Sequence, residues 1–215
     1  LINLFYTDRP EGIAKADIVI LPGSKATIAD LALLREKKLD DAIRAAKERD
    51  ASIVGICGGY QMMGMTVSDP EGIEGKPETV EGLGLLPVDT VIGNSKVTRN
   101  VSFTSLPHSQ NELSEGYEIH MGRTTLRPGA SPLNVVMPGE VADGCIVGDC
   151  CFGTYIHGWL DNEAQIRMLL SRFLPDADID FNYRRFRDEQ YDRLAEMLRE
   201  NLNIPLIYKI LSRND

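Results

Sequence analysis

The sequence predicts an α/β fold: a doubly wound, mostly parallel sheet flanked by helices, with an antiparallel insertion. Short apolar runs alternate with helical patterns over about the first 65 residues, which is typical of βαβ units. One of these runs ends in a glycine-bounded cysteine and passes directly into a helical pattern. From Ser68 to Pro138, Gly, Pro, Thr and Val are frequent and helical periodicity is weak, which predicts antiparallel strands and loops. Reactive groups are therefore expected where the parallel strands end, at their carboxyl edge.

The elements before the cysteine are predicted from apolar runs and turn residues. Leu1–Tyr6 is predicted to be a strand, followed by a turn at Asp8–Gly12. Asp17–Pro22 is a second apolar strand that ends in Pro-Gly-Ser. Apolar residues at helical spacing then predict one helix from about Thr27 to Arg49. Ile53–Ile56 is the strand that leads to the cysteine.

The second half of the chain resumes strand character and ends in helices. The insertion includes a strand at Gly116–His120, and Cys145–Ile156 is extended with a turn at Gly148–Asp149. From about Glu163 to residue 215 the pattern is a helical tail, which Pro205 interrupts. We expect residues 1–215 to form one domain that includes this tail.

Composition limits the classes of function. A chain of 215 residues with 43% hydrophobic residues can bury a full core. A net charge of −9 without a long basic block argues against nucleic acid or an anionic membrane as partner. No apolar run approaches the roughly 18 residues of a membrane span, and no signal peptide opens the chain. Four cysteines do not make a disulfide framework in a domain of this size, so a cytoplasmic location is expected.

The cysteine motif predicts a nucleophile. Gly55-Ile-Cys57-Gly-Gly59 has the form of the strand-to-helix elbow, with Cys where hydrolases carry Ser. Small neighbours permit the strained turn, and the start of a helix favours the thiolate, which predicts a lowered pKa for Cys57. The alternative is a buried structural cysteine followed by a glycine turn.

Two further groups complete a candidate acyl-transfer site. His157 ends an apolar run and precedes a glycine, which places it at a strand end as a base for the thiol. The other histidines are His108, in a polar loop, and His120. Backbone N–H groups of Gly23, in Leu-Pro-Gly-Ser-Lys, and of Gly58 can stabilise an oxyanion. The spacing of the remaining cysteines fits no common zinc motif, so no metal site is predicted: Cys145, Cys150 and Cys151.

Ordered motifs relate the chain to a known family. They are Leu21–Lys25, Gly55–Gln61, Val80–Pro87, Gly116–Thr124 and Gly153–Gly158, followed by Arg187–Leu194 in the tail. Together they span nearly the whole chain. In these motifs and their order, the chain resembles the class I (CobB/CobQ-type) glutamine amidotransferase domain of the cobyric acid synthase family. That domain has a flavodoxin-like fold.

The resemblance implies a role for each matched position. Cys57 would attack the glutamine amide and form a γ-glutamyl thioester, and His157 would protonate the departing ammonia and then activate water. Gly23 and Gly58 would form the oxyanion hole. The implied glutamine-binding positions are Gln61, Glu118 and His120.

The resemblance also implies partners that lie outside this domain. Family enzymes carry an amino-terminal synthetase domain that uses ATP and Mg²⁺ and binds the corrinoid acceptor, so this chain is expected to be a fragment without cofactors of its own. Ammonia would pass from the glutamine site to that domain for amidation of adenosylcobyrinic acid a,c-diamide.

One departure concerns the histidine. Many class I amidotransferases carry a Glu two residues after the His, where this chain has Trp159, so the sequence identifies no acid behind His157. Two alternatives remain: a glutaminase serving a related ligase, such as the lipid II amidating complex, and a non-catalytic interaction domain on the same scaffold.

Overall fold

The computed structural model describes residues 2–106, 112–175 and 182–212. It divides into two compact units, Leu1–Ala177 and Asp178–Asp215. The first unit contains the described strands and the predicted site residues, and the described part of the second contains two helices.

A four-stranded sheet carries the cysteine motif. Its order is β1 (Ile18–Leu21), β2 (Ser52–Ile56), β10 (Cys151–Thr154) and β9 (Cys145–Val147). The first three strands are parallel and β9 is antiparallel to β10. The carboxyl ends of β1, β2 and β10 therefore lie at one edge of the sheet, as the sequence predicts.

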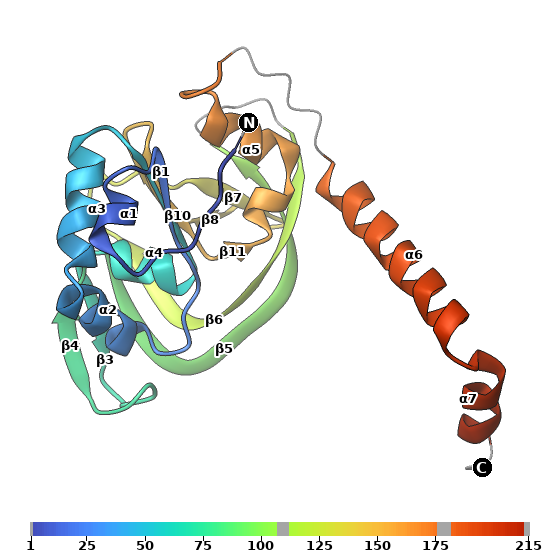
Figure 1. Cartoon of the computed structure of the whole chain (residues 1–215). Helices are drawn as coiled ribbons and strands as arrows, with labels where there is room; N and C mark the ends of the chain where they lie inside the picture. The colour runs from blue at the N-terminus through green and yellow to red at the C-terminus, as the bar shows by residue number, and fades with distance from the viewer. Residues whose placement is uncertain (1, 107–111, 176–181, 213–215) are drawn as a thin grey trace. The chain divides into compact units, whose positions relative to one another are not determined.

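A second, seven-stranded sheet contains the antiparallel insertion. Its main path is β11 (Ile156–His157), β6 (Ser114–Leu126), β5 (Val88–Ser105), β3 (Thr66–Asp69) and β4 (Glu78–Glu81). The remaining pair, β7 (Asn134–Met137) and β8 (Val141–Asp143), joins β5. β5 and β6 are long neighbouring strands that curve together in Figure 1, with a register shift between Ile92 and Val97.

The chain changes sheets just before the candidate histidine. β10 pairs with β2 in the first sheet, whereas β11 pairs with β6 in the second. Only Tyr155 lies between β10 and β11. This crossing brings His157 out of the parallel sheet.

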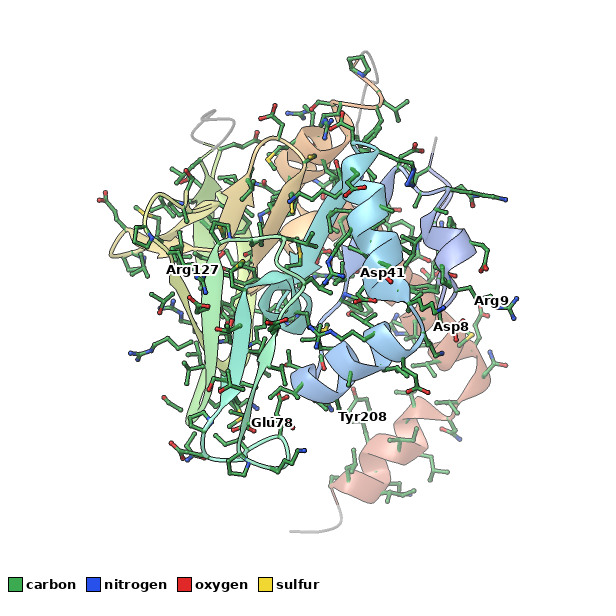
Figure 2. All side chains as sticks on the ribbon, turned by 90° about the vertical axis from the view of Figure 1, so that its left-hand side faces the viewer. Asp8, Arg9, Asp41, Glu78, Arg127 and Tyr208 are labelled. Atoms are coloured by element: carbon green, nitrogen blue, oxygen red, sulfur yellow. The ribbon has the colours of Figure 1, made fainter. Side chains whose placement is uncertain are left out.

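Helices cover the four-stranded sheet. α2 (Thr27–Glu36) and α3 (Leu39–Glu48) follow β1, and α4 (Gly58–Met63) follows the cysteine. α2 and α3 lie in front of the strands in Figure 2, where Asp41 is labelled on α3 and Arg127 just beyond the end of β6. The main core joins these helices to the sheet through fully buried side chains, among them Leu31, Ile53 and Met63. Burial of such side chains stabilises the fold by about 1.5–3 kcal/mol each.

The remaining described helices are either shorter than α2 and α3 or belong to the second unit. They are α1 (Pro10–Ile13), η1 (Trp159–Asp161), α5 (Glu163–Leu170), α6 (Tyr183–Asn201) and α7 (Ile204–Leu211). The described part of the predicted tail contains α5, α6 and α7, and α6 ends before Pro205, which lies in the first turn of α7. No described helix is both long enough and apolar enough to cross a membrane.

The α/β class, the strands at β1 and β2, and the antiparallel insertion are confirmed. The strand predicted at Leu1–Tyr6 is wrong for its described part, because residues 2–6 pair with no described strand and Ile2, Leu4, Phe5 and Tyr6 are exposed. Backbone groups without a ladder partner do not make a sheet.

Two shorter predictions are also corrected. The turn at Asp8–Gly12 is instead the start of α1, with Pro10 at a position in the first turn where its missing N–H costs nothing. The single helix predicted from Thr27 to Arg49 is two helices, because Lys38 adopts a left-handed conformation (φ 58°) between α2 and α3. A left-handed residue cannot continue a right-handed helix.

Candidate active site

Cys57 lies on a strained turn at the carboxyl end of β2. Its φ of 53° and ψ of −110° are unusual for a residue with a side chain, and they end the strand and start α4 in one step. The flanking glycines are required: a Cβ on Gly59 would lie 2.0 Å from the Leu21 carbonyl oxygen, and one on Gly55 would lie 2.7 Å from the Tyr60 backbone N. The local sequence therefore builds the elbow that the motif predicts.

The Cys57 thiol is held as a neutral group. It donates a hydrogen bond to the Ile119 carbonyl oxygen in β6 at 3.6 Å. Burial raises the pKa of Cys57, the hydrogen bond from the Gly58 N–H opposes this, and the Glu74 carboxylate adds to it. The predicted lowering of this pKa is thus wrong, because burial of the thiolate outweighs the N-terminus of a helix of six residues.

His157 is a neutral base beside the elbow. Burial lowers its pKa and His120 acts in the same direction, so the imidazole is uncharged at neutral pH. Its Nε2 is buried and has no hydrogen-bond partner within the described part of the chain. The ring stacks on Tyr117, its cross-strand neighbour in β6, with centroids 5.0 Å apart and planes at 11°. A neutral imidazole with a free nitrogen can accept a proton from a thiol.

Gly23 joins the two groups. A Cβ built on Gly23 would lie 3.4 Å from His157 Cε1 and 3.7 Å from Cys57 Cβ. The structure therefore brings Gly23, Cys57 and His157 together at the carboxyl ends of β1 and β2.

Gly58 makes a second close approach in the same loop. A Cβ on Gly58 would lie 2.5 Å from the backbone N of Ser24, so the loop after β1 and the start of α4 touch through their backbones. This is an arrangement in which backbone N–H groups can face an oxyanion.

Gln61 is buried, and both ends of its side-chain amide are hydrogen-bonded. Thr27 Oγ1 donates to Gln61 Oε1 at 2.9 Å, and Gln61 Nε2 donates to the Tyr155 hydroxyl at 3.1 Å. Thr27 Oγ1 also lies 3.1 Å from Glu74 Oε1 and shares its one proton between the two oxygens, and the Tyr155 hydroxyl is bonded to Thr124. The side chain of Gln61 thus links α4 to α2 and to Tyr155 at the sheet crossing.

Glu118 and His120 lie on β6, next to the site. Glu118 is 5% exposed and pairs with Arg99, its cross-strand neighbour, at 2.5 Å. His120 Nδ1 is bonded to the Gly122 carbonyl oxygen at 2.8 Å, so this nitrogen carries the proton, and the ring stacks on Tyr155 at 3.8 Å. Their assignment to glutamine binding stays a prediction, while His108 lies outside the described residues.

Trp159, two residues after His157, belongs to the core. It is fully buried, packs against Phe152, and donates from Nε1 to Asn134 Oδ1 at 3.2 Å. Its side chain is therefore closed off from solvent.

Sequence reasoning missed several groups around the site. Tyr117 and Tyr155 lie within two of the family motifs, next to Glu118 and close to His157. Their place in those motifs was the signal that could have identified them. Glu74 and Asp143 lie in a loop and a short strand that carry no motif, so they are visible only in three dimensions.

The geometry agrees with what comparison with known proteins shows. Residues 2–165 match the family model described as the CobB/CobQ-like glutamine amidotransferase domain. The chain belongs to this glutamine amidotransferase family. It is 47% identical, over its full length, to a cobyric acid synthase of Phocaeicola vulgatus, and 45% identical over 96% of its length to one of Parabacteroides distasonis. The chain spans 43% and 42% of these relatives.

Solved structures support the amidotransferase fold. A crystal structure of a glutamine amidotransferase aligns with a TM-score of 0.56 at 17% identity, covering 77% of this chain and 83% of that one. PurLQS from Thermotoga maritima aligns with a TM-score of 0.52 at 17% identity, covering 73% and 79%. These likenesses concern the fold of the family domain.

Proposed function

We propose that this domain hydrolyses glutamine through Cys57 and supplies ammonia to a cobyric acid synthase reaction. The observation that carries the first part is the meeting of Cys57, His157 and Gly23 at one sheet edge. The second part rests on the similarity, over 100% and 96% of this chain, to two proteins named cobyric acid synthase.

The chemistry uses a neutral thiol and a neutral imidazole. His157 takes the Cys57 proton as the sulfur attacks the side-chain amide carbon of glutamine, and backbone N–H groups of Gly23 and Gly58 stabilise the oxyanion. His157 returns the proton to the leaving nitrogen, so the C–N bond breaks and ammonia departs from a γ-glutamyl thioester. Water, deprotonated by His157, then releases glutamate and restores the thiol.

The use of the ammonia would depend on a synthetase domain outside residues 1–215. The curated relatives are more than twice as long as this chain, which leaves room for a fused synthetase domain. That domain would use ATP and Mg²⁺ to activate the carboxylates of adenosylcobyrinic acid a,c-diamide, and the ammonia would convert them to amides.

The test of the glutamine site is alkylation by 6-diazo-5-oxo-norleucine, followed by mass spectrometry. We expect one adduct at Cys57, suppressed by excess glutamine and lost in Cys57→Ala. Cys150→Ala removes a partly exposed cysteine as the matched control and should label normally. Labelling that glutamine does not suppress, or that maps to Cys150, would contradict the proposal.

The ammonia-transfer step has its own test in the full-length protein. Cys57→Ala should lose amidation of the corrinoid with glutamine but keep it with added ammonium salts. Loss of amidation with ammonium salts as well would contradict the proposal, because Cys57 would then be needed for more than glutamine hydrolysis.

A further inference from the structure

A buried carboxylate lies close to the sheet crossing that carries His157. Asp143, the last residue of β8, is 6% exposed and has no ion-pair partner within the described part of the chain. Burying an unpaired carboxylate is costly unless hydrogen bonds replace the lost water. The residues that hydrogen-bond to Asp143 therefore indicate what this buried carboxylate does.

Within the described residues, the Asp143 carboxylate accepts hydrogen bonds from the crossing itself and from Asn134 beside it. Oδ2 accepts from the Thr154 hydroxyl and, at 2.9 Å, from Asn134 Nδ2, while Oδ1 accepts from the Tyr155 backbone N–H at 3.1 Å. These bonds lower the pKa of Asp143, but burial dominates and raises it. The carboxylate thus fixes the two residues at which the chain leaves one sheet for the other.

The same network reaches the nucleophile. The Thr154 carbonyl oxygen accepts from the Cys57 N–H at 2.8 Å, and its hydroxyl accepts from the Ile156 N–H at 3.0 Å. Thr154 therefore links Asp143 to the backbone of Cys57 on one side and to the residue before His157 on the other.

The far side of His157 is held as well. Asn134 pairs with Asp143 in the β7–β8 ladder, and its Oδ1 accepts from Trp159 Nε1 at 3.2 Å. Gly144 permits the close fit, because a Cβ there would lie 2.4 Å from the Gly153 carbonyl oxygen. Residues 154, 155 and 159 are thus all bound to one buried pair, and they bracket position 157.

We propose that Asp143, together with Asn134, is a positioning residue that sets the location of His157 relative to Cys57. The Asp143 carboxylate holds the two residues at the crossing before His157, and Asn134 holds the Trp159 side chain after it. The inference rests on the proposed glutamine hydrolysis by Cys57 and His157.

The first test is Asp143→Asn in the full-length protein. Whichever oxygen is replaced, the new amide N–H faces a donor, the Tyr155 N–H or the Asn134 amide, so the crossing must shift. We expect kcat for glutamine hydrolysis to fall about 10- to 100-fold with KM within about threefold, because small misplacements of a reacting group cost rate rather than binding. Asp40→Asn, at a carboxylate of similar burial on α3, should change neither.

A second pair of variants tests the link through Thr154. Thr154→Val removes the hydroxyl at nearly constant volume and should lower kcat about 10-fold, whereas Thr154→Ser keeps the hydroxyl and should retain kcat within about threefold. Equal kcat in these two variants would overturn the inference, as would a loss in Asp143→Asn that appears wholly in KM.

The imidazole signals of His157, observed by NMR and assigned by their loss in His157→Gln, provide a readout that needs no turnover. They should shift in Asp143→Asn and stay in place in Asp40→Asn. Unchanged signals overturn the positioning role even if wild-type protein hydrolyses no glutamine, a result that would refute the proposed function separately.

Discussion

Gly23→Ala is expected to remove activity without removing stability. The added methyl group would lie 3.4 Å from His157 Cε1, 3.7 Å from Cys57 Cβ and 4.0 Å from the Ile56 carbonyl oxygen. These are ordinary contact distances, and Gly23 does not adopt a left-handed conformation. The free protein can therefore accept the methyl group, and a smaller loss of chain entropy on folding should change the free energy of unfolding by less than about 1 kcal/mol.

The same distances put the methyl group where the reaction takes place. A reacting carbon must come within roughly 3–3.5 Å of the attacking atom, so the substrate amide and this methyl group compete for the space between Cys57 and His157. Displacement from the oxyanion donors alone costs about 10²- to 10³-fold, or about 2.7–4 kcal/mol of transition-state stabilisation. We expect kcat/KM for glutamine to fall by at least this factor.

The assay is glutamate release at several glutamine concentrations, together with thermal unfolding. Gly93→Ala is the matched control, because a Cβ there meets no atom within 4 Å and it should leave both measurements unchanged. The reasoning is refuted if Gly23→Ala keeps kcat/KM within about threefold of wild type, or if it unfolds far below wild type.

Three further predictions concern the same site. Gly58→Ala, whose Cβ would lie 2.5 Å from Ser24 N, should lower the free energy of unfolding by about 1–3 kcal/mol in chemical denaturation; an unchanged midpoint would contradict the close contact. Because the pKa of His157 is lowered from 6.5, the base stays neutral into mild acid, so the acidic limb of the kcat/KM profile should have its midpoint below 6.5 rather than above it. Tyr117→Phe keeps the ring stacked on His157 and should retain kcat within about twofold, whereas Tyr117→Leu should lower it about 5- to 20-fold; equal rates would exclude a role for the stack.

The sequence predicts the reactive edge because its signals are local. Gly55, Cys57 and Gly59 specify a turn that few other residues can adopt, and the strand before it is a continuous apolar run. Parallel strand order then brings the ends of β1 and β2 to one edge, so the neighbourhood of Gly23 and Cys57 follows from topology.

The features that sequence reasoning missed depend on packing between distant segments. Lys37 and Lys38 carry no helix-breaking signal, so the end of α2 is set by how α2 and α3 pack rather than by local propensity. The raised pKa of Cys57 likewise comes from burial under β6, more than 60 residues along the chain, which the helix-dipole argument alone leaves out.

The β6 strand contacts both members of the candidate dyad. Its Ile119 carbonyl oxygen accepts a hydrogen bond from the Cys57 thiol, and its Tyr117 ring is stacked on the imidazole of His157. A thiol has one proton to donate, so its S–H must turn away from this carbonyl before His157 can deprotonate it. Since β11 is itself bonded to β6, the strand that holds the thiol in its neutral form also sets the place of the base that must activate it. Activation of the nucleophile and positioning of the base are therefore two consequences of where one strand lies.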